Sequence, residues 1–170
     1  MALTKALEEF CGKAIKLGAT ESKVIRASDI VVRDWVRLKC QYGCSEYGKR
    51  LTCPPYSPTP EQMRRVLSEY SSAILLRFKP DWENVHNVIA KLEREAFLSG
   101  YYSAFGLASG PCPFCKRCNL KNCVHPELAR PSMEACGIDV FATVRKAGFT
   151  ISVVRTHRES PKYFGLLLAI

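Results

Sequence analysis

The chain has 170 residues, of which 47% are hydrophobic and 24% are charged, which indicates a globular protein and excludes a disordered or fibrous one. Its length fits a single domain, and no apolar stretch is long enough to cross a bilayer or resemble a signal peptide, so we expect a cytoplasmic protein without membrane contacts. The formal net charge of +9 indicates an acidic partner such as nucleic acid, but Lys and Arg are scattered along the chain, which favours an ordinary solvated surface.

The first part of the chain is predicted to begin with a helix. Apolar residues recur at helical spacing over Leu3–Leu17, and Gly18 is a typical helix end. β-branched residues favour strands over Lys23–Arg26 and Ile30–Val36. From Lys39 to Pro60 the periodicity is lost, which predicts a long irregular loop. Loops of this length in compact domains are usually functional or disordered, and its three cysteines favour a functional one.

The rest of the chain alternates predicted helices and strands. Thr59 followed by Pro60 is a typical helix start, and Asp81 is a suitable cap for a second, longer helix. The predicted helices run from Thr59 to Tyr70, from Asp81 to Ser99 and from Ser132 to Ala147, and the predicted strands are Ala73–Phe78, Tyr101–Leu107, Thr150–Arg155 and Tyr163–Ile170. Residues 108–130 form a second irregular loop. We expect an α/β (α+β) fold, a mixed β-sheet with helices packed on it, in which both cysteine-rich loops follow strands.

Nine cysteines in a chain of this kind do not indicate a disulfide framework, because the cytosol keeps thiols reduced. The odd count points the same way. Ligation of a metal or a metal cluster is the favoured interpretation, and the spacing of the cysteines refines it.

The second loop carries four cysteines at a spacing close to that of bacterial ferredoxin loops, namely Cys112, Cys115, Cys118 and Cys123. A single zinc ion needs sulfurs only about 3.8 Å apart, which two distant cysteine pairs supply easily. A cubane presents its iron atoms over a wider body, so one short loop must curl around it. We therefore predict that these four residues hold a [4Fe–4S] cluster, with zinc as the alternative. Unliganded buried thiols are the least favoured interpretation.

Four basic residues accompany these cysteines, namely Lys116, Arg117, Lys121 and Arg130. Two interpretations stay open at this stage. Either the cations offset the negative charge of a cluster or face a redox partner, or they are the ordinary basic residues of an exposed loop.

The first loop carries Cys40, Cys44 and Cys53 together with two Tyr-Gly dipeptides. The spacing differs from that of radical-SAM loops, because the third cysteine follows too late. Either these three residues bind a second cluster with a fourth ligand from elsewhere, or one of them completes a mixed site with the second loop. A cluster held by only three thiolates has an open iron that could bind a substrate. This is the one route to catalysis that the sequence offers, so whether the protein is an enzyme stays open.

The remaining cysteines and the histidines are weaker candidates. Cys11 lies among apolar residues at a helical position and is favoured as a small core residue. Cys136 is a minor candidate for the missing ligand of the first loop. For His125, a turn before Pro126 is favoured over metal ligation. His86 has no catalytic arrangement around it, and no catalytic triad, phosphate-binding glycine loop or paired carboxylates are present.

Three stretches carry a resemblance, namely C-x-x-x-C-x-x-Y-G…C-P-P at 40–55, C-x-x-C-x-x-C at 112–118 and H-P-x-x-A-R-P-S-M-E-A-C-G-I-D-V at 125–140. With them the chain resembles an uncharacterised family of prokaryotic proteins, common in archaea and anaerobes, described as predicted metal-binding proteins with a domain of unknown function. The likeness covers nearly the whole chain. It implies metal or iron–sulfur binding by the seven loop cysteines and no known reaction. The family usually has an aromatic residue at the position of Cys136, which weakens this cysteine as a ligand.

The leading hypothesis is therefore a small iron–sulfur protein, with one metal-binding domain over residues 1–170 and one or two [4Fe–4S] clusters. It would act in electron transfer with a redox partner protein, or as an accessory to an anaerobic enzyme. Two alternatives are kept. The first is a zinc-stabilised binding module that contacts RNA, although nucleic acid is not the favoured partner. The second is an enzyme with an open iron at the three cysteines of the first loop. The sequence leaves the oligomeric state open.

Overall fold

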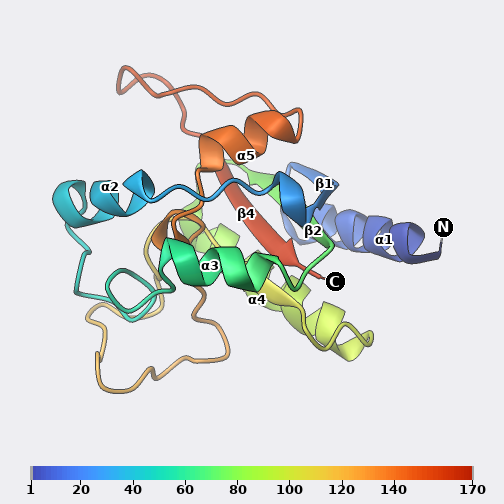
Figure 1. Ribbon diagram of the computed structural model, residues 1–170, viewed down its shortest axis with the longest axis horizontal. Coiled ribbons are helices and arrows are strands. Elements are labelled where there is room, and N and C mark those ends of the chain that lie inside the picture. Colours follow the sequence, from blue (N-terminus) through green and yellow to red (C-terminus); the bar gives the residue numbers. More distant parts are fainter. Residues whose placement is uncertain (1, 170) are drawn as a thin grey trace.

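The computed structural model describes residues 2–169, with side chains from Ala6 onward. The helices are α1 (Ala2–Leu17), α2 (Trp35–Gly43), α3 (Pro60–Leu67), α4 (Trp82–Leu98) and α5 (Val140–Lys146), with the short 3-10 helices η1 (Ala27–Asp29) and η2 (Glu134–Cys136). The strands are β1 (Glu21–Arg26), β2 (Ser72–Phe78), β3 (Phe105–Leu107) and β4 (Tyr163–Leu168). Figure 1 shows the helices on both faces of the sheet and two long loops at the lower left.

The four strands form one open sheet in the order β1-β2-β4-β3. The structure confirms an α+β fold with helices packed on a sheet. It differs in strand direction, because every pairing between the named strands is antiparallel and the sheet is not mixed. β2 and β3 do run parallel to each other, as a strand–helix–strand unit through α4 predicts. However, β4 lies between them, so the two parallel strands never pair.

Both faces of the sheet are buried, which explains why its central strands are apolar over most of their length. In β2, Ile74 and Leu76 pack in the core beneath α1 and α4, whereas Leu75 packs in the core shared with α3 and α5. In β4, Leu167 faces the first core and Leu166 faces the second. Successive side chains of a strand alternate between faces, so each strand serves two cores.

Helix α4 lies close against the edge of the sheet formed by β4 and β3. A Cβ atom added at Gly165 would lie 2.9 Å from Cδ1 of Ile89, so only glycine allows this approach. The side chain of Glu93, also on α4, accepts a hydrogen bond of 2.7 Å from the backbone N–H of Gly106 in β3. Since β3 leads directly into the second cysteine loop, this packing fixes where that loop leaves the sheet.

The strand predicted over Ile30–Val36 is wrong. After η1 the chain is extended, but within the described chain it forms only an isolated bridge between Val32 and Ile138, and helix α2 begins at Trp35. Ile30 and Val32 pack in the same core as Ile138. The segment around Ile138 is not a strand, so the pairing of Val32 with Ile138 does not extend into a sheet. As a consequence Cys40 lies on a helix, and the first loop follows α2 instead of a strand.

The helix predicted over Ser132–Ala147 is interrupted. Gly137 has a φ of +80° and ends η2, because this left-handed conformation cannot continue a helix. Helix α5 then starts afresh after Asp139, whose side chain accepts a hydrogen bond of 2.9 Å from the N–H of Ala142.

The strand predicted over Thr150–Arg155 is also absent from the described structure, since this segment pairs with no strand and most of it is exposed. The strand predicted from Tyr101 is shortened to Phe105–Leu107. The predicted helices corresponding to α1, α3 and α4 and the predicted strands β1, β2 and β4 are confirmed. Position 170, at the end of the last predicted strand, lies outside the described residues. Among residues 2–169, no helix is long and apolar enough to cross a membrane.

Candidate metal centre

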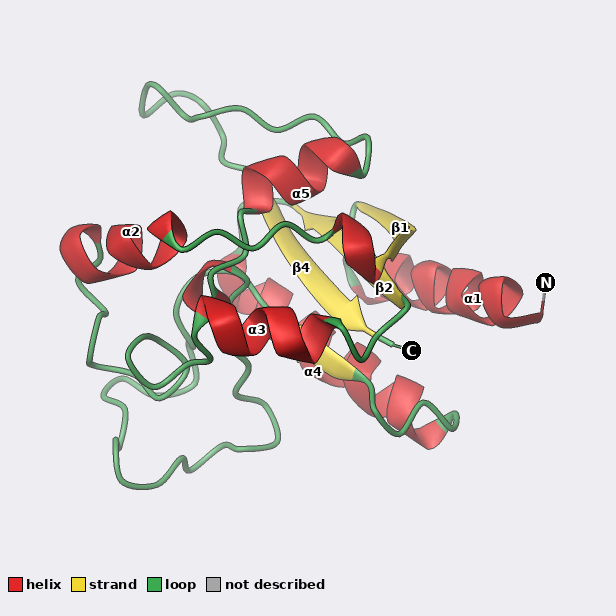
Figure 2. Cartoon of the chain, viewed as in Figure 1, coloured by secondary structure: helices red, strands yellow, loops and turns green. Residues whose placement is uncertain are grey.

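In the structure the second loop covers residues 109–131, one residue later than predicted. Its two ends are joined by hydrogen bonds next to β3. The N–H of Ala108 donates to the carbonyl of Pro131 at 2.8 Å, and the N–H of Met133 donates to the carbonyl of Ala108 at 3.2 Å. The segment between contains turns and no helix or strand, as the long green loop at the lower left of Figure 2 shows. The four predicted ligands therefore lie on one loop whose ends are fixed together.

An ion pair anchors the far end of the second loop to α4. Arg130 donates through Nε and Nη2 to the two carboxylate oxygens of Glu93, each at 2.6 Å, and both side chains are about 15% exposed or less. Arg130 also donates to the carbonyls of Pro126 and Ala129. Of the two interpretations of the basic residues, neither fits Arg130, because its charge is used to hold the loop against the helix.

His86 holds the beginning of the second loop through a hydrogen bond and an aromatic contact. The residue is fully buried on α4, and its Nε2 lies 3.1 Å from the carbonyl of Ser109. Its ring meets Trp82 and Phe114 edge to face at centroid distances of 6.3 and 6.1 Å. Burial lowers the pKa of His86 to about 4. The ring is thus neutral at pH 7, and because a carbonyl only accepts, Nε2 carries the hydrogen.

The cysteines of the second loop are all partly buried. Burial raises the pKa of the Cys112 thiol, and the nearby charges of Cys115 and Cys123 raise it further. The thiols of Cys115 and Cys123 thus both act on that of Cys112. Cys118 belongs to the same loop and lies in the wall of a cavity between the two loops.

The three cysteines of the first loop differ in their burial. Burial raises the pKa of Cys53 to about 11, with further contributions from the charges of Cys44 and Cys40. Cys53 is 8% exposed, whereas Cys44 is exposed at the end of α2. Cys136, in η2, is fully buried, and burial raises its pKa to about 12. The Sγ atom of Cys40 lies 4.0 Å from the carbonyl oxygen of Glu134, which belongs to the same 3-10 helix as Cys136, so Cys136 lies near Cys40.

Arg50 joins the two loops and was not anticipated from the sequence. Its Nη1 donates to the carbonyls of Cys112 and Cys115, at 2.9 and 3.0 Å, and its Nε donates to Glu46 at 2.6 Å. The guanidinium is mostly buried. The only signal in the sequence is the Glu46–Arg50 pair at the i, i+4 spacing. The two cysteine loops therefore contact each other, through a side chain of one and the backbone of the other.

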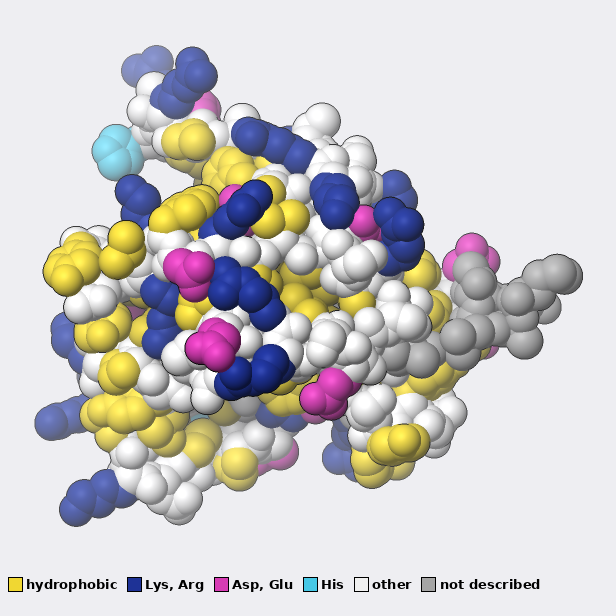
Figure 3. All heavy atoms as spheres, viewed as in Figure 1, with side chains coloured by type: hydrophobic (Ala, Val, Ile, Leu, Met, Phe, Trp, Pro, Cys, Tyr) yellow, Lys and Arg dark blue, Asp and Glu magenta, His cyan; other side chains and the backbone are white. Residues whose placement is uncertain are grey.

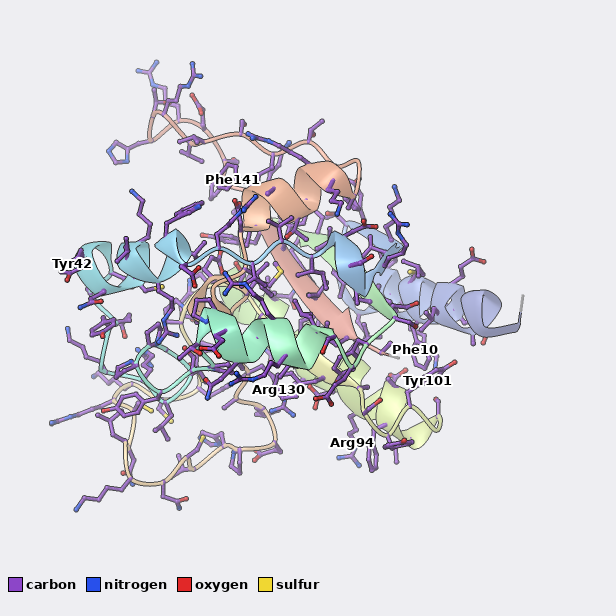
Figure 4. All side chains as sticks on the ribbon, in the orientation of Figure 1. Phe10, Tyr42, Arg94, Tyr101, Arg130 and Phe141 are labelled. Carbon is purple, nitrogen blue, oxygen red and sulfur yellow. The ribbon has the colours of Figure 1, made fainter. Side chains whose placement is uncertain are left out.

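The donor atoms fit a soft metal centre, because thiolates are the ligands that iron–sulfur clusters and zinc both take. In Figure 4 sulfur atoms lie at the lower left, below the end of α2 marked by Tyr42. Within residues 6–169, no three His, Cys, Asp or Glu side chains are arranged to hold one metal ion. The ligand assignment of the seven loop cysteines stays a prediction.

The comparison with protein families shows the family of the chain and its coarse function. Residues 23–169 match DUF2284, described as a predicted metal-binding protein. The chain belongs to this family. The match includes both cysteine loops and confirms the resemblance found in the sequence. Neither the curated proteins nor the solved structures contain a match to this DUF2284 chain.

A second arginine fixes the end of the first loop in this DUF2284 protein. Arg37 of α2 donates through Nη1 to Oγ of Ser57 at 3.0 Å and to the carbonyl of Ala135 at 2.9 Å. Ser57 is buried, and its hydroxyl donates to the same carbonyl at 2.6 Å. Helix α2, the first loop and η2 therefore meet at one polar centre, directly beside Cys40 and Cys136.

An apolar cavity of about 460 Å³ opens beside the first group of cysteines. Cys40 and Cys44 line it, together with Trp35 of α2 and the segment 151–154. Glu134 also lines it, and its Oε2 is buried without a hydrogen-bond partner among the described residues. The volume is in the range of small-molecule sites, which are typically apolar with a few polar groups.

Proposed function

We propose that this DUF2284 protein binds a [4Fe–4S] cluster through Cys112, Cys115, Cys118 and Cys123 and acts in electron transfer, or as an accessory to an anaerobic enzyme. The observation that carries the proposal is the construction of the second loop. Its four thiols lie on one segment that is closed at the base, and Arg50 holds the carbonyls of two of the ligands. When bound, such a cluster takes up and releases single electrons.

The residues of the chain would contribute rigidity, partial exclusion of water and positive charge. The Arg130–Glu93 pair and His86 hold the two ends of the loop, so the four thiols stay on one segment whose ends are fixed. Partial burial of the ligands and nearby cations both act on the reduction potential of a cluster. We place the protein in the cytoplasm, where thiols stay reduced, and expect a redox partner protein.

Single cysteine substitutions test this proposal. Anaerobically purified wild-type protein should be brown, and dithionite should produce an electron paramagnetic resonance signal. Cys118→Ser should lose most of its iron or change the signal. Cys11→Ser is the matched control, because Cys11 is half-buried on α1, outside the loops. A Cys118→Ser protein with the iron content and signal of the wild type would overturn the assignment, as would a colourless wild type with one zinc per chain.

A second candidate function follows from the apolar cavity. Cys40 and Cys44 line it, and with Cys53 they are the three thiols of the first loop; Cys136 is a candidate fourth ligand near Cys40. If only three thiolates held a second cluster, one iron would keep an open position facing the cavity. We propose small-molecule binding there, and hence an enzyme, as the competing function.

Cyanide is a suitable probe for this candidate, because it binds open iron positions. Its addition should change the resonance signal of the wild type, and Cys40→Ser should abolish the change while the signal of the second loop persists. If Cys136→Ala removes the same signal as Cys40→Ser, Cys136 is a ligand and the open position does not exist.

A further inference from the structure

A cavity of about 820 Å³ lies between the first and the second cysteine loop. The first loop contributes Glu46, Lys49 and Arg50 to its walls, and the second contributes Lys116, Arg117 and Lys121. Five cations thus face one acidic residue. Figure 3 shows Lys and Arg side chains projecting at the lower left of the molecule, where Figure 1 places the two loops.

The positive charge of this cavity is not balanced by the protein. The carboxylate of Glu46 is already paired with Arg50 at 2.6 Å. Lys49, Lys116, Arg117 and Lys121 form no ion pair with any side chain within residues 6–169. On α3, by contrast, Arg64 is paired with Asp34 and Arg65 with Glu61. Unpaired like charges in one concave place attract an anionic ligand from a distance.

The position of the cavity connects it to the proposed metal centre. Cys118, one of the four predicted ligands, lies in its wall between Arg117 and Asn119. Arg50, which holds the carbonyls of two further ligands, forms the opposite side. Any molecule seated in the cavity therefore lies against the second loop beside Cys118.

The lining also favours one class of macromolecule. Single-stranded nucleic acids are bound by basic grooves that also carry aromatic side chains for base stacking, and no aromatic residue lines this cavity. Leu120 is its one large apolar contact. A basic, non-aromatic surface beside a redox centre suits a transient protein complex, in which complementary charge sets the rate of association.

We propose that this cavity, which we call the basic cleft, is the docking site for an acidic electron-carrier protein. The inference rests on the proposed iron–sulfur function, and it adds the place and the charge of the partner. Complementary charge would steer the acidic carrier to Lys49 and Lys121 and orient it with its redox group toward Cys118.

Binding of a flavodoxin of strongly negative charge to the full-length, anaerobically prepared protein tests the proposal, with titration calorimetry as the readout. The cleft variant carries Lys49→Glu and Lys121→Glu. The control variant carries Lys16→Glu and Lys91→Glu, which change the net charge equally at exposed positions on α1 and α4. A milder cleft variant with Gln at both positions serves if the Glu variant does not fold.

We expect the cleft variant to weaken binding by at least about tenfold at low salt, and the control by far less. Binding to the wild type should fade between about 0.01 M and about 1 M salt, because the Debye length falls from about 30 Å to about 3 Å. Equal affinities of the cleft and control variants would overturn the proposal. So would failure of the wild type to bind flavodoxin, or tighter binding of a single-stranded oligonucleotide than of flavodoxin.

The metal content of the same samples separates this proposal from the one on which it rests. Iron and sulfide without flavodoxin binding would overturn the docking site and leave the cluster in place. Zinc in place of iron would overturn the cluster, while the dependence of binding on Lys49 and Lys121 would still be measured.

Discussion

At the scale of single residues, Arg50 has the largest structural consequence for the candidate metal centre. One guanidinium donates to two carbonyls of the second loop and to Glu46 of the first. Hydrogen bonds to charged groups contribute about 1.5–3 kcal/mol each, so this one side chain accounts for much of the attachment between the loops. The carbonyls belong to Cys112 and Cys115, so Arg50 sets the position of two predicted ligands without contacting a metal.

Arg50→Lys should therefore weaken metal retention while keeping the charge. A lysine is a point charge without the planar set of donors, so it cannot reproduce three hydrogen bonds in these directions. Residues that orient metal ligands typically affect affinity by about 10- to 100-fold, and we expect iron loss to a chelator within that range. Hydrogen exchange at residues 112–118 should also become faster. Arg65→Lys, at an exposed helix pair, is the control. Unchanged retention and exchange would contradict the role given to Arg50.

His86 predicts how stability depends on pH. Its pKa is about 4 in the folded protein against 6.5 for an ordinary histidine, because burial disfavours the charged ring. Above pH 6.5 both states are neutral at this site, and as the pH falls toward 4 only the unfolded state takes up a proton. Stability is thus lost from about pH 6.5 downward. Lowering the pH from about 7 to about 5 should therefore reduce the free energy of unfolding by about 2 kcal/mol through His86.

Urea unfolding at the two pH values measures this effect. His86→Leu is the comparison, because it cannot titrate and should lose about 2 kcal/mol less than the wild type between about pH 7 and about pH 5. Parallel losses in the two proteins would show that His86 is not the neutral, buried group described.

At the scale of elements, the ion pair between Arg130 and Glu93 attaches the second loop to α4. Both side chains are about 15% exposed or less, so removing one partner leaves a poorly solvated charge. Arg130→Met should therefore destabilise the fold by about 3 kcal/mol, whereas Arg65→Met, at an exposed pair, should cost less than about 1 kcal/mol. Unfolding in urea provides both values.

The double variant Glu93→Gln with Arg130→Met gives the decisive comparison, because it also removes the negative charge of Glu93 that Arg130→Met leaves unpaired. It should be more stable than Arg130→Met alone. If the double variant loses the sum of the single effects, the pair is not coupled and the loop is held by other contacts.

The elements that could be predicted are those defined by neighbouring residues. Thr59 with Gln62 forms the expected capping box, and Asp81 caps α4 as its position indicated. The break at Gly137 could not be predicted in the same way, because an added Cβ there would meet Pro60, which is distant in the sequence. The extended segment at Val32 likewise depends on pairing with Ile138.

At the scale of the whole molecule, the two cysteine-rich loops could be recognised from the sequence, whereas the contacts that support them could not. The spacing of Cys112, Cys115 and Cys118 is local, and the family match includes it. The contacts of Arg50 join positions 62 and 65 residues apart, and Arg37 reaches Ala135 over 98 residues. Neither contact leaves a local pattern.

The content of iron, acid-labile sulfide and zinc in the anaerobically purified full-length chain tests the central claim most directly. We expect about four iron and about four sulfide per chain for one cluster, and about twice these values if the first loop holds a second. Zinc should be far below one per chain. One zinc per chain, without sulfide, would contradict the iron–sulfur function and make this DUF2284 protein a zinc-stabilised module.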